Sequence, residues 1–258
     1  MFAKTMVFPR MSTPELSTAV KWELDQSVPF PPNDIESSWS VFEKNSYVGE
    51  DKVGAYVVAV PSKVSELYLQ LFELLGLETT RLENEVAPLV RAYVPFLEEI
   101  NPTLILDIGY SGVKIALANK YMIFGSYYFS VGSQAITSLI ADNFGLTLDQ
   151  AEQYKRTYGM EESQLDGKIH KVVKPIIDNM VMEIRKMILS FRNDYGEAKP
   201  ARLILTGGGS SLMGLAVYLS KSLDGIEVLL GNPFEGQDVD QQYQTLGGSF
   251  SLVFGMST

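Results

Sequence analysis

The residues best suited to binding or catalysis follow two apolar, strand-like segments. In the first segment, residues 104–117 (LILDIGYSGVKIAL), Asp107 stands at the end of the strand and precedes a short turn of glycine and serine. The backbone N–H groups of such a turn can point at a phosphate, and the carboxylate can stand beside a metal ion. The residues expected to contact phosphate here are Asp107, Gly109, Ser111 and Gly112.

The second segment, residues 203–219 (LILTGGGSSLMGLAVYL), has three glycines between a strand and a predicted helix. Glycines at this point let a nucleotide approach the backbone and the helix N-terminus. Neither segment is a Walker loop or a dinucleotide-binding fingerprint, because GK[ST] and GxGxxG with a following acidic residue are absent. A single glycine-rich turn after a strand can be merely structural. The presence of both turns, in this order, is a more specific indication of a nucleotide site. The residues expected to contact a nucleotide here are Gly207, Gly208, Gly209 and Ser210.

Other kinds of site are limited by the cysteine and histidine counts. The chain has no cysteine, which excludes disulfides, thiolate metal sites and thiol catalysis. Its single histidine, His170, leaves no multi-histidine metal cluster. His170 lies in a polar stretch, DGKIHK, and we expect it to be a surface residue at the start of a helix.

Composition indicates an ordinary folded protein. Of the 258 residues, 46% are hydrophobic and 20% are charged, and 21 basic against 31 acidic side chains give a net charge of −10. This charge disfavours nucleic acid and anionic lipid as partners. No apolar run approaches the roughly 18 residues that span a bilayer, and the first residues lack the apolar core of a signal peptide. We therefore expect a soluble cytoplasmic protein with no membrane insertion.

The elements that must position these residues alternate between strands and helices, which predicts an α/β fold. The strand at 53–60 (VGAYVVAV) is almost continuously apolar and should be central in its sheet. Capping boxes begin helices at residues 12–15 and 147–150. The predicted strands are 5–8, 38–44, 53–60, 103–108, 113–118, 121–130, 201–205 and 228–230. The predicted helices are 13–27, 62–75, 84–99, 133–144, 147–158, 167–192, 212–223 and 242–254.

Together, the two glycine-containing segments resemble the phosphate-2 and adenosine motifs of the actin-like ATPase superfamily, which includes actin, sugar kinases and heat-shock chaperones. Residues 82–92 (LENEVAPLVRA) resemble its first connecting helix, where Glu85 matches an acidic residue that orients the attacking water. Residues 151–156 (AEQYKR) resemble the helix whose glutamate and lysine contact the ribose and base, here Glu152 and Lys155. A solvated helix face is the alternative for this last pair.

The cofactors and catalytic roles follow only from that resemblance. It implies ATP and Mg2+, with Glu85 and Asp107 as the catalytic residues and Asp107 as the residue at the metal. Two nearby side chains add chemistry of their own. Tyr110 is bulky for a phosphate-2 turn, and Lys114 adds a cation that either favours a phosphate or faces solvent.

Within the superfamily, the chain resembles the PilM family of type IV pilus assembly proteins, relatives of the cell-division protein FtsA. The resemblance is carried by 4–43 (KTMVFPRMSTPELSTAVKWELDQSVPFPPNDIESSWSVFE), GLTLDQAEQYKRTYG, TGGGSSLMGLAVYLSKSL and GNPFE. It implies an actin-like (ribonuclease H-like) two-lobe fold with an inserted small α/β subdomain. The implied division is 1–77 inserted subdomain, 78–103 remnant of the first lobe, 104–241 second lobe and 242–258 a C-terminal helix returning to the first lobe.

The function implied by this family is a scaffold of the pilus inner-membrane assembly. Such a protein binds the short cytoplasmic N-terminus of a membrane-spanning partner, PilN, in a groove beside the inserted subdomain. That partner would hold it at the inner face of the membrane. Nucleotide would bias the orientation of the lobes, as in a two-state hinge protein.

The sequence departs from the family pattern at its start. It enters at the inserted subdomain, so the family's first strands and their phosphate-1 DxG loop are not in it. Phosphoryl transfer depends on positioning and charge stabilisation, so ATP hydrolysis should be weak or absent. A first lobe that lacks strands is also expected to be poorly stable or to self-associate.

Two alternative functions remain. The first is an active ATPase or small-molecule kinase of the same fold, although a kinase needs a catalytic base that we cannot identify. The second is an FtsA-like cell-division adaptor, which would bring a basic amphipathic helix for the membrane. The tail TLGGSFSLVFGMST carries no charge, which argues against that adaptor.

Overall fold

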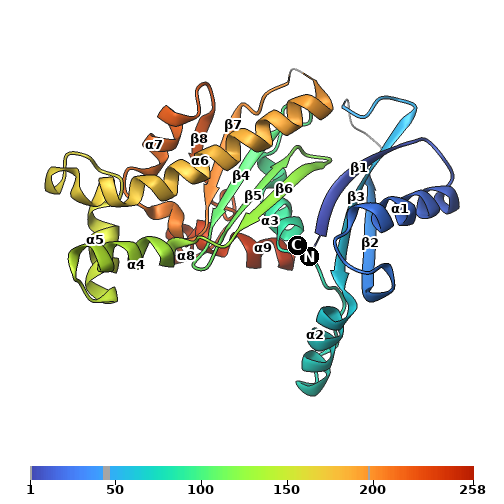
Figure 1. Cartoon of the computed structure of the whole chain (residues 1–258), viewed down its shortest axis with the longest axis horizontal. Coiled ribbons are helices and arrows are strands. Elements are labelled where there is room, and N and C mark those ends of the chain that lie inside the picture. The colour runs from blue at the N-terminus through green and yellow to red at the C-terminus, as the bar shows by residue number, and fades with distance from the viewer. Residues whose placement is uncertain (1, 43–46, 197) are drawn as a thin grey trace.

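The computed structural model describes residues 2–42, 47–196 and 198–258, which form two β-sheets (Figure 1). The smaller sheet is antiparallel with the order β1-β3-β2, so β3 is central, as its apolar run predicted. Its elements are β1 (Phe2–Pro9), α1 (Thr13–Ser27), β2 (Ile35–Phe42) and β3 (Lys52–Pro61). Of the predicted strand 38–44, positions 43 and 44 lie outside the described residues.

Helix α1 begins as its pattern predicted. The backbone N–H and the hydroxyl of Ser12 both donate to the Glu15 carboxylate, at 2.9 and 2.7 Å, which closes the predicted capping box. The buried face of the helix packs on apolar residues of β3, and its members are Leu16, Val20 and Leu24.

Helix α2 (Ser62–Leu74) follows β3 and extends away from the small sheet (Figure 1). Its apolar residues have the predicted helical spacing, but most of them are exposed, and Leu74 is 85% exposed. This exposed apolar stripe consists of Val64, Leu67, Tyr68, Leu71, Leu74 and Leu75.

The larger sheet has the order β6-β5-β4-β7-β8. The β6-β5-β4 part is antiparallel, whereas β7 pairs parallel with β4 and β8 pairs parallel with β7. Every residue of β4 and β5 is buried, as expected for central strands covered on both faces. Its strands are β4 (Thr103–Ile108), β5 (Val113–Ala118), β6 (Ile123–Phe129), β7 (Arg202–Thr206) and β8 (Glu227–Leu230).

Helices cover both faces of this sheet (Figure 1). Alternate residues of β4 point to opposite sides, so Leu104 and Leu106 contact one helical layer and Ile105 contacts the other. The first layer contains α4 (Ser133–Phe144), α5 (Leu148–Tyr158), the long α6 (Lys168–Tyr195) and α7 (Leu215–Ser222). The second contains α3 (Val86–Tyr93) and α9 (Ser251–Ser257).

Helices α3 and α9 approach each other closely. A side chain at Gly255 would collide with the carbonyl of Pro88, so only glycine permits this contact. Behind the helices lies a buried cluster of three hydroxyls from α3, β7 and α9. Tyr93 Oη is 2.8 Å from Thr206 Oγ1 and 2.7 Å from Ser251 Oγ, and the last two are 2.7 Å apart. We call these three residues the hydroxyl cluster.

Three predicted helices are broken, or shorter by more than one residue, in the structure. The helix expected at 84–99 ends at Tyr93, because Pro95 in the following 3-10 turn (Val94–Phe96) cannot donate a backbone hydrogen bond. The helix expected at 242–254 is wrong: it is broken into α8 (Gln241–Thr245), a 3-10 turn (Gly247–Phe250) and α9. The break frees the Gly248 carbonyl to accept from the backbone of Gly207.

The third is the helix expected at 212–223, which begins only at Leu215. A 3-10 turn (Gly208–Ser211) comes first, and Gly214 then adopts a left-handed φ of 76°. The three glycines therefore do not lead directly into a helix N-terminus.

The prediction that His170 is a surface residue is also wrong. Its ring is buried, with 5% exposed, and Nδ1 lies 2.9 Å from the carbonyl oxygen of Met160. Nε2 lies 3.3 Å from the Glu162 carboxylate. His170 precedes the buried Val173 by three positions, so the helix turns it toward the core despite its polar neighbours. Among the described residues, no helix combines the length and apolarity needed to cross a membrane.

Candidate functional site

The two glycine turns meet at one edge of the large sheet. Strands β4 and β7 are parallel and pair Asp107 with Thr206, so Asp107 and Gly207 end neighbouring strands on the same side. Gly207 has a φ of 83°, and a Cβ there would clash with the Asp107 carboxylate and lie 2.5 Å from the Ile108 carbonyl oxygen. A Cβ at Gly209 would clash with the Ile108 side chain. Glycine is therefore required for the two turns to touch.

The turn after β4 is held by the start of α4. Gly109 donates to the carbonyl of Gly112 at 2.9 Å, and the first N–H groups of α4 donate back to this turn. Ser133 N–H reaches the Gly109 carbonyl at 2.9 Å, and Gln134 N–H reaches the carbonyl of Tyr110 at 3.0 Å. The Tyr110 side chain is 71% exposed, so it does not fill the turn. Within the turn the Gly109 N–H is thus already paired, and Ser111 lies exposed.

Lys114 lies on β5 directly opposite Asp107. Its Nζ is 3.0 Å from Asp107 Oδ2 and 3.5 Å from Glu85 Oε1, and both Lys114 and Asp107 are buried. Burial acts to lower the pKa of Lys114, but the two carboxylates outweigh it and leave the pKa above its usual value. Lys114 is thus a permanent buried cation, and the alternative that it faces solvent is wrong.

These contacts bear on the predicted metal at Asp107. Among the described residues, no group of three or more His, Cys, Asp or Glu side chains could hold a metal ion. Oδ2 of Asp107 binds Lys114, while Oδ1 lies against Gly207. Asp107 is therefore paired with Lys114, and the described residues offer no cluster of carboxylates around it for a metal ion.

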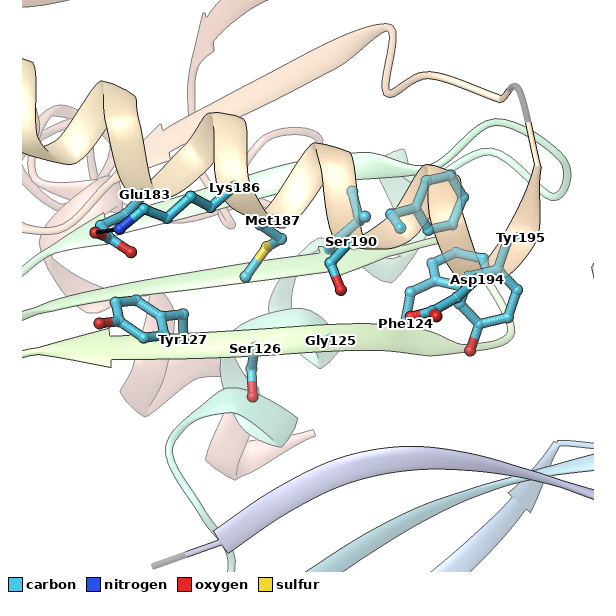
Figure 2. A pocket seen from close by; sticks show the side chains of 12 residues that line it. Phe124, Gly125, Ser126, Tyr127, Glu183, Lys186, Met187, Ser190, Asp194 and Tyr195 are labelled. Carbon is cyan, nitrogen blue, oxygen red and sulfur yellow. Dashed lines mark hydrogen bonds and ion pairs between the residues drawn. The ribbon is translucent and has the colours of Figure 1, made fainter.

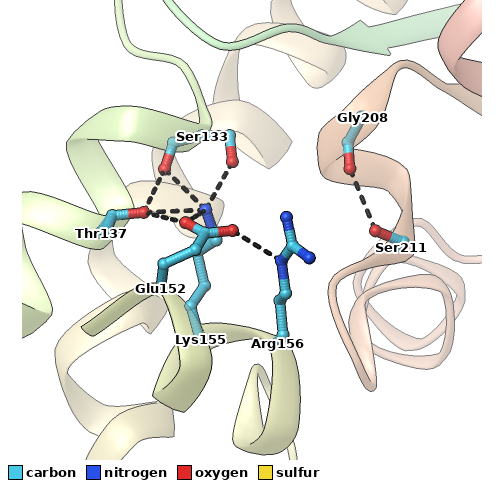
Figure 3. A network of polar contacts seen from close by, with 7 residues as sticks. All are labelled: Ser133, Thr137, Glu152, Lys155, Arg156, Gly208 and Ser211. Carbon is cyan, nitrogen blue, oxygen red and sulfur yellow. Dashed lines mark hydrogen bonds and ion pairs between the residues drawn. The ribbon is translucent and has the colours of Figure 1, made fainter. Parts of the chain in front are cut away.

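A second polar group joins α4 and α5 around Lys155 (Figure 3). Lys155 Nζ is 2.6 Å from Glu152 Oε2, and the ammonium also reaches the hydroxyls of Ser133 at 2.7 Å and Thr137 at 2.8 Å. Arg156 Nε donates to the other Glu152 oxygen at 2.9 Å. Burial acts to raise the pKa of Glu152, but hydrogen bonds from Lys155, Thr137 and Arg156 lower it to about 2. Lys155 is buried, so the alternative interpretation, that it lies on a solvated helix face, is wrong.

A cleft of about 290 Å³ separates this group from the second glycine turn (Figure 3). Its walls combine apolar carbons, charged groups and glycine backbone, which suits a flat ring joined to a polar sugar and phosphates. The lining residues are Ser133, Ile136, Glu152, Lys155, Arg156, Gly208, Gly209, Ser211 and Leu212. A hollow of about 470 Å³ continues from it toward Tyr110.

The structure places four of the predicted site residues on the cleft: Glu152, Lys155, Gly208 and Gly209. Asp107 and Gly207 meet at the ends of β4 and β7 but are not among the residues that line it. Ser210 instead donates to its own turn at the Gly207 carbonyl, 2.7 Å away.

Glu85 is joined to the site through Lys114 and does not line the cleft. Sequence reasoning missed Ser133, Thr137 and Arg156. The four-residue spacing of Ser133 and Thr137 on one helix face is a signal that could have found the first two.

Two other hollows contain none of these residues. One, of about 310 Å³, lies between β6 and the C-terminal half of α6 (Figure 2). It is bordered by an aromatic group in which the Phe124 and Phe191 rings are 4.9 Å apart, and by the Glu183–Lys186 ion pair. The second, of about 250 Å³, runs along edge strand β2 toward Asn84. We call it the β2 groove.

Comparison with known proteins agrees with this architecture. The family described as type IV pilus assembly protein PilM matches residues 2–246. Among solved structures, the chain is similar to a PilM–PilN type IV pilus biogenesis complex. The identity is 26% and the TM-score 0.80, and the match covers 99% of this chain and 75% of that chain.

More distant structures share the fold alone. The ethanolamine utilization protein EutJ from Carboxydothermus hydrogenoformans is 20% identical, with a TM-score of 0.53 over 77% of this chain and 61% of that chain. MreB5 of Spiroplasma citri bound to AMPPNP is 13% identical, with a TM-score of 0.57 over 77% of this chain and 64% of that chain. The predicted actin-like α/β fold is thereby confirmed.

One curated relative is EutJ of Escherichia coli (strain K12), 26% identical over 170 residues, or 66% of this chain. The match spans about half of that protein's length, 54%.

Proposed function

Because this chain belongs to the PilM family of type IV pilus assembly proteins, we propose that it is an actin-like scaffold of the pilus inner-membrane assembly. It binds the N-terminal peptide of a PilN-type protein, and an adenine nucleotide modulates its conformation. The protein lies in the cytoplasm, at the inner face of the membrane through that partner. The observation that carries the proposal is the similarity, over 99% of the chain, to a structure in which PilM is in complex with PilN.

The β2 groove is our candidate for the peptide site. Strand β2 is an edge strand of the small sheet, so one side of its backbone is open to pairing. An extended peptide can add to such an edge through main-chain hydrogen bonds while side-chain pockets give specificity. Val58 and Leu82 supply apolar surface in the groove, and Asn84 supplies an amide whose Nδ2 donates to Tyr56 at 2.7 Å.

A peptide titration tests this proposal. A fluorescently labelled peptide from the N-terminus of a PilN-type protein should bind saturably. Leu82→Ala should weaken that binding by about fivefold, because it removes an exposed apolar side chain from the groove. Leu77→Ala is the matched control, because Leu77 is exposed and does not line the groove. Equal affinity of the two variants, or equal binding of a scrambled peptide, would refute the assignment.

The candidate nucleotide site is the cleft between Lys155 and the second glycine turn. Glu152 can accept hydrogen bonds from ribose hydroxyls, and the backbone of Gly208 and Gly209 can approach phosphate oxygens. Ile136 and Leu212 offer apolar contact for a base. These features support an adenine nucleotide as the ligand.

An active ATPase is the weaker candidate. The two carboxylates that would hold metal and water, Asp107 and Glu85, both bind Lys114. An ethanolamine-utilization role is also weaker, because the EutJ match leaves about a third of the chain unaligned, whereas the PilM match runs through the small sheet. We therefore favour a nucleotide-sensitive scaffold.

A further inference from the structure

The cleft between α5 and the second glycine turn contains a cation whose donors are only partly used. Arg156 lines this cleft and also the hollow that continues from it. Its side chain is 77% exposed, and its Nε donates to Glu152 Oε1 at 2.9 Å. Figure 3 shows the guanidinium in the space between Glu152 and the wall of Gly208 and Ser211. Among the described residues only Nε has a partner, so both terminal nitrogens remain available as donors.

The other cation of the cleft is already fully occupied. Lys155 is buried, and its ammonium contacts the Glu152 carboxylate and the hydroxyls of Ser133 and Thr137 at 2.6 to 2.8 Å. The pKa of Glu152, about 2, keeps that carboxylate ionised. Two cations against one carboxylate leave the lining of the cleft with one positive charge, and the exposed guanidinium of Arg156 carries it.

A single phosphate group matches this arrangement. The terminal N–H groups of a guanidinium form a planar fork that holds phosphate oxygens through charge-assisted hydrogen bonds. The glycine wall leaves room for such a group, because a Cβ added at Gly208 would have no atom within 4 Å. Further phosphates would gain no comparable contact in the continuing hollow. To the charged residues of the cleft, the described lining of that hollow adds the carboxylate of Asp149 and no cation.

We propose that Arg156 is the phosphate-binding residue of the cleft and that the site recognises a nucleotide by its nucleoside and the one phosphate attached to it. AMP then binds this chain about as tightly as ATP does. The inference rests on the proposed nucleotide function and deepens it by naming the class of ligand. Glu152 has two tasks in this arrangement, because it accepts from the ribose and also holds Nε so that the fork faces the phosphate.

Titration calorimetry of the purified chain with adenosine, AMP and ATP tests this, once in EDTA and once with excess Mg2+. In both media AMP should bind about tenfold or more tightly than adenosine, and ATP should stay within about threefold of AMP. Arg156→Gln should weaken AMP binding by about tenfold and should leave adenosine binding within about twofold of the wild-type value. Arg81→Gln is the matched control, because Arg81 is also an exposed arginine paired with a glutamate, Glu83, but lies outside the cleft.

The fold should tolerate the Arg156 substitution, because the side chain is exposed and Glu152 keeps Lys155 and Thr137 as partners. An equal loss of adenosine and AMP affinity in Arg156→Gln would place Arg156 at the base or ribose and would overturn the inference. ATP binding more than about tenfold tighter than AMP would also overturn it, while the proposed nucleotide site would stand. If none of the three ligands bound the wild-type chain, the nucleotide proposal itself would fail, and this inference with it.

Discussion

Adjacent glycines in the second glycine turn should respond oppositely to the same substitution. Gly207 has a φ of 83°, and a Cβ there meets the Asp107 carboxylate and the Ile108 carbonyl. Gly208 has nothing within 4 Å of an added Cβ and no left-handed φ. The two alanine substitutions therefore differ in two respects: the φ angle of the substituted residue and the space around its new Cβ.

The magnitudes follow from that geometry. A left-handed φ costs alanine about 1 kcal/mol, and overpacking against atoms that cannot move adds about 1–3 kcal/mol. The lower entropy of the unfolded alanine chain returns about 0.4–1 kcal/mol in both variants. We expect Gly207→Ala to lower the free energy of unfolding by about 2 kcal/mol, whereas Gly208→Ala should leave it unchanged or slightly higher.

Urea unfolding followed by far-ultraviolet circular dichroism measures this difference as a shift of the midpoint at constant slope. Circular dichroism is preferable to tryptophan fluorescence, because both tryptophans, Trp22 and Trp39, belong to elements of the small sheet. Equal midpoints for the two variants would refute the reasoning, since they would mean that the first and second glycine turns do not touch at Gly207.

Two further predictions concern polar groups that the fold has buried. The pKa of Glu152, about 2 when folded against 4.5 in the unfolded chain, means that its stabilisation is present above pH 4.5 and is lost as pH falls toward 2. Discounted for solvent screening, this stabilisation amounts to about 1 kcal/mol. Glu152→Gln should therefore reduce the fall in the free energy of unfolding between pH 4.5 and pH 2. Asp149→Asn, on the same helix, should not. His170→Ala should lower the thermal midpoint by an amount equivalent to about 1–3 kcal/mol, because it leaves the Met160 carbonyl without its partner. Lys171 is the exposed neighbour, and Lys171→Ala should change the stability by less than about 0.5 kcal/mol.

Local signals predicted the two helix starts that carry capping boxes. The capping boxes at Ser12 and Thr147 depend only on residues three positions apart, so both appear where the sequence places them. Asp107 and Gly207 could also be expected to meet, because the carboxyl ends of parallel strands share one edge of a sheet. These features need no knowledge of side-chain packing.

Features that depend on register or on distant packing could not be read in advance. Lys114 faces Asp107 only because the β4–β5 pairing places the two residues opposite each other. The broken helix near the C-terminus reflects the bond from Gly207 to Gly248, which joins residues 41 positions apart. His170 was misjudged because its polar neighbours in sequence are not its neighbours in space. In each case a tertiary contact outweighed the local pattern.

The hydroxyl cluster has a consequence for the order in which the protein matures. Tyr93, Thr206 and Ser251 come from three elements, and α9 is the last of them to leave the ribosome. Until then α3 packs on the sheet without α9, and the hydroxyls of Tyr93 and Thr206 lack their third member. Docking of α9 therefore adds the missing contacts to α3, to β7 and to the backbone behind the second glycine turn in a single late step. A chain shortened to end before residue 251 should be more sensitive to protease at α3 than one that includes α9.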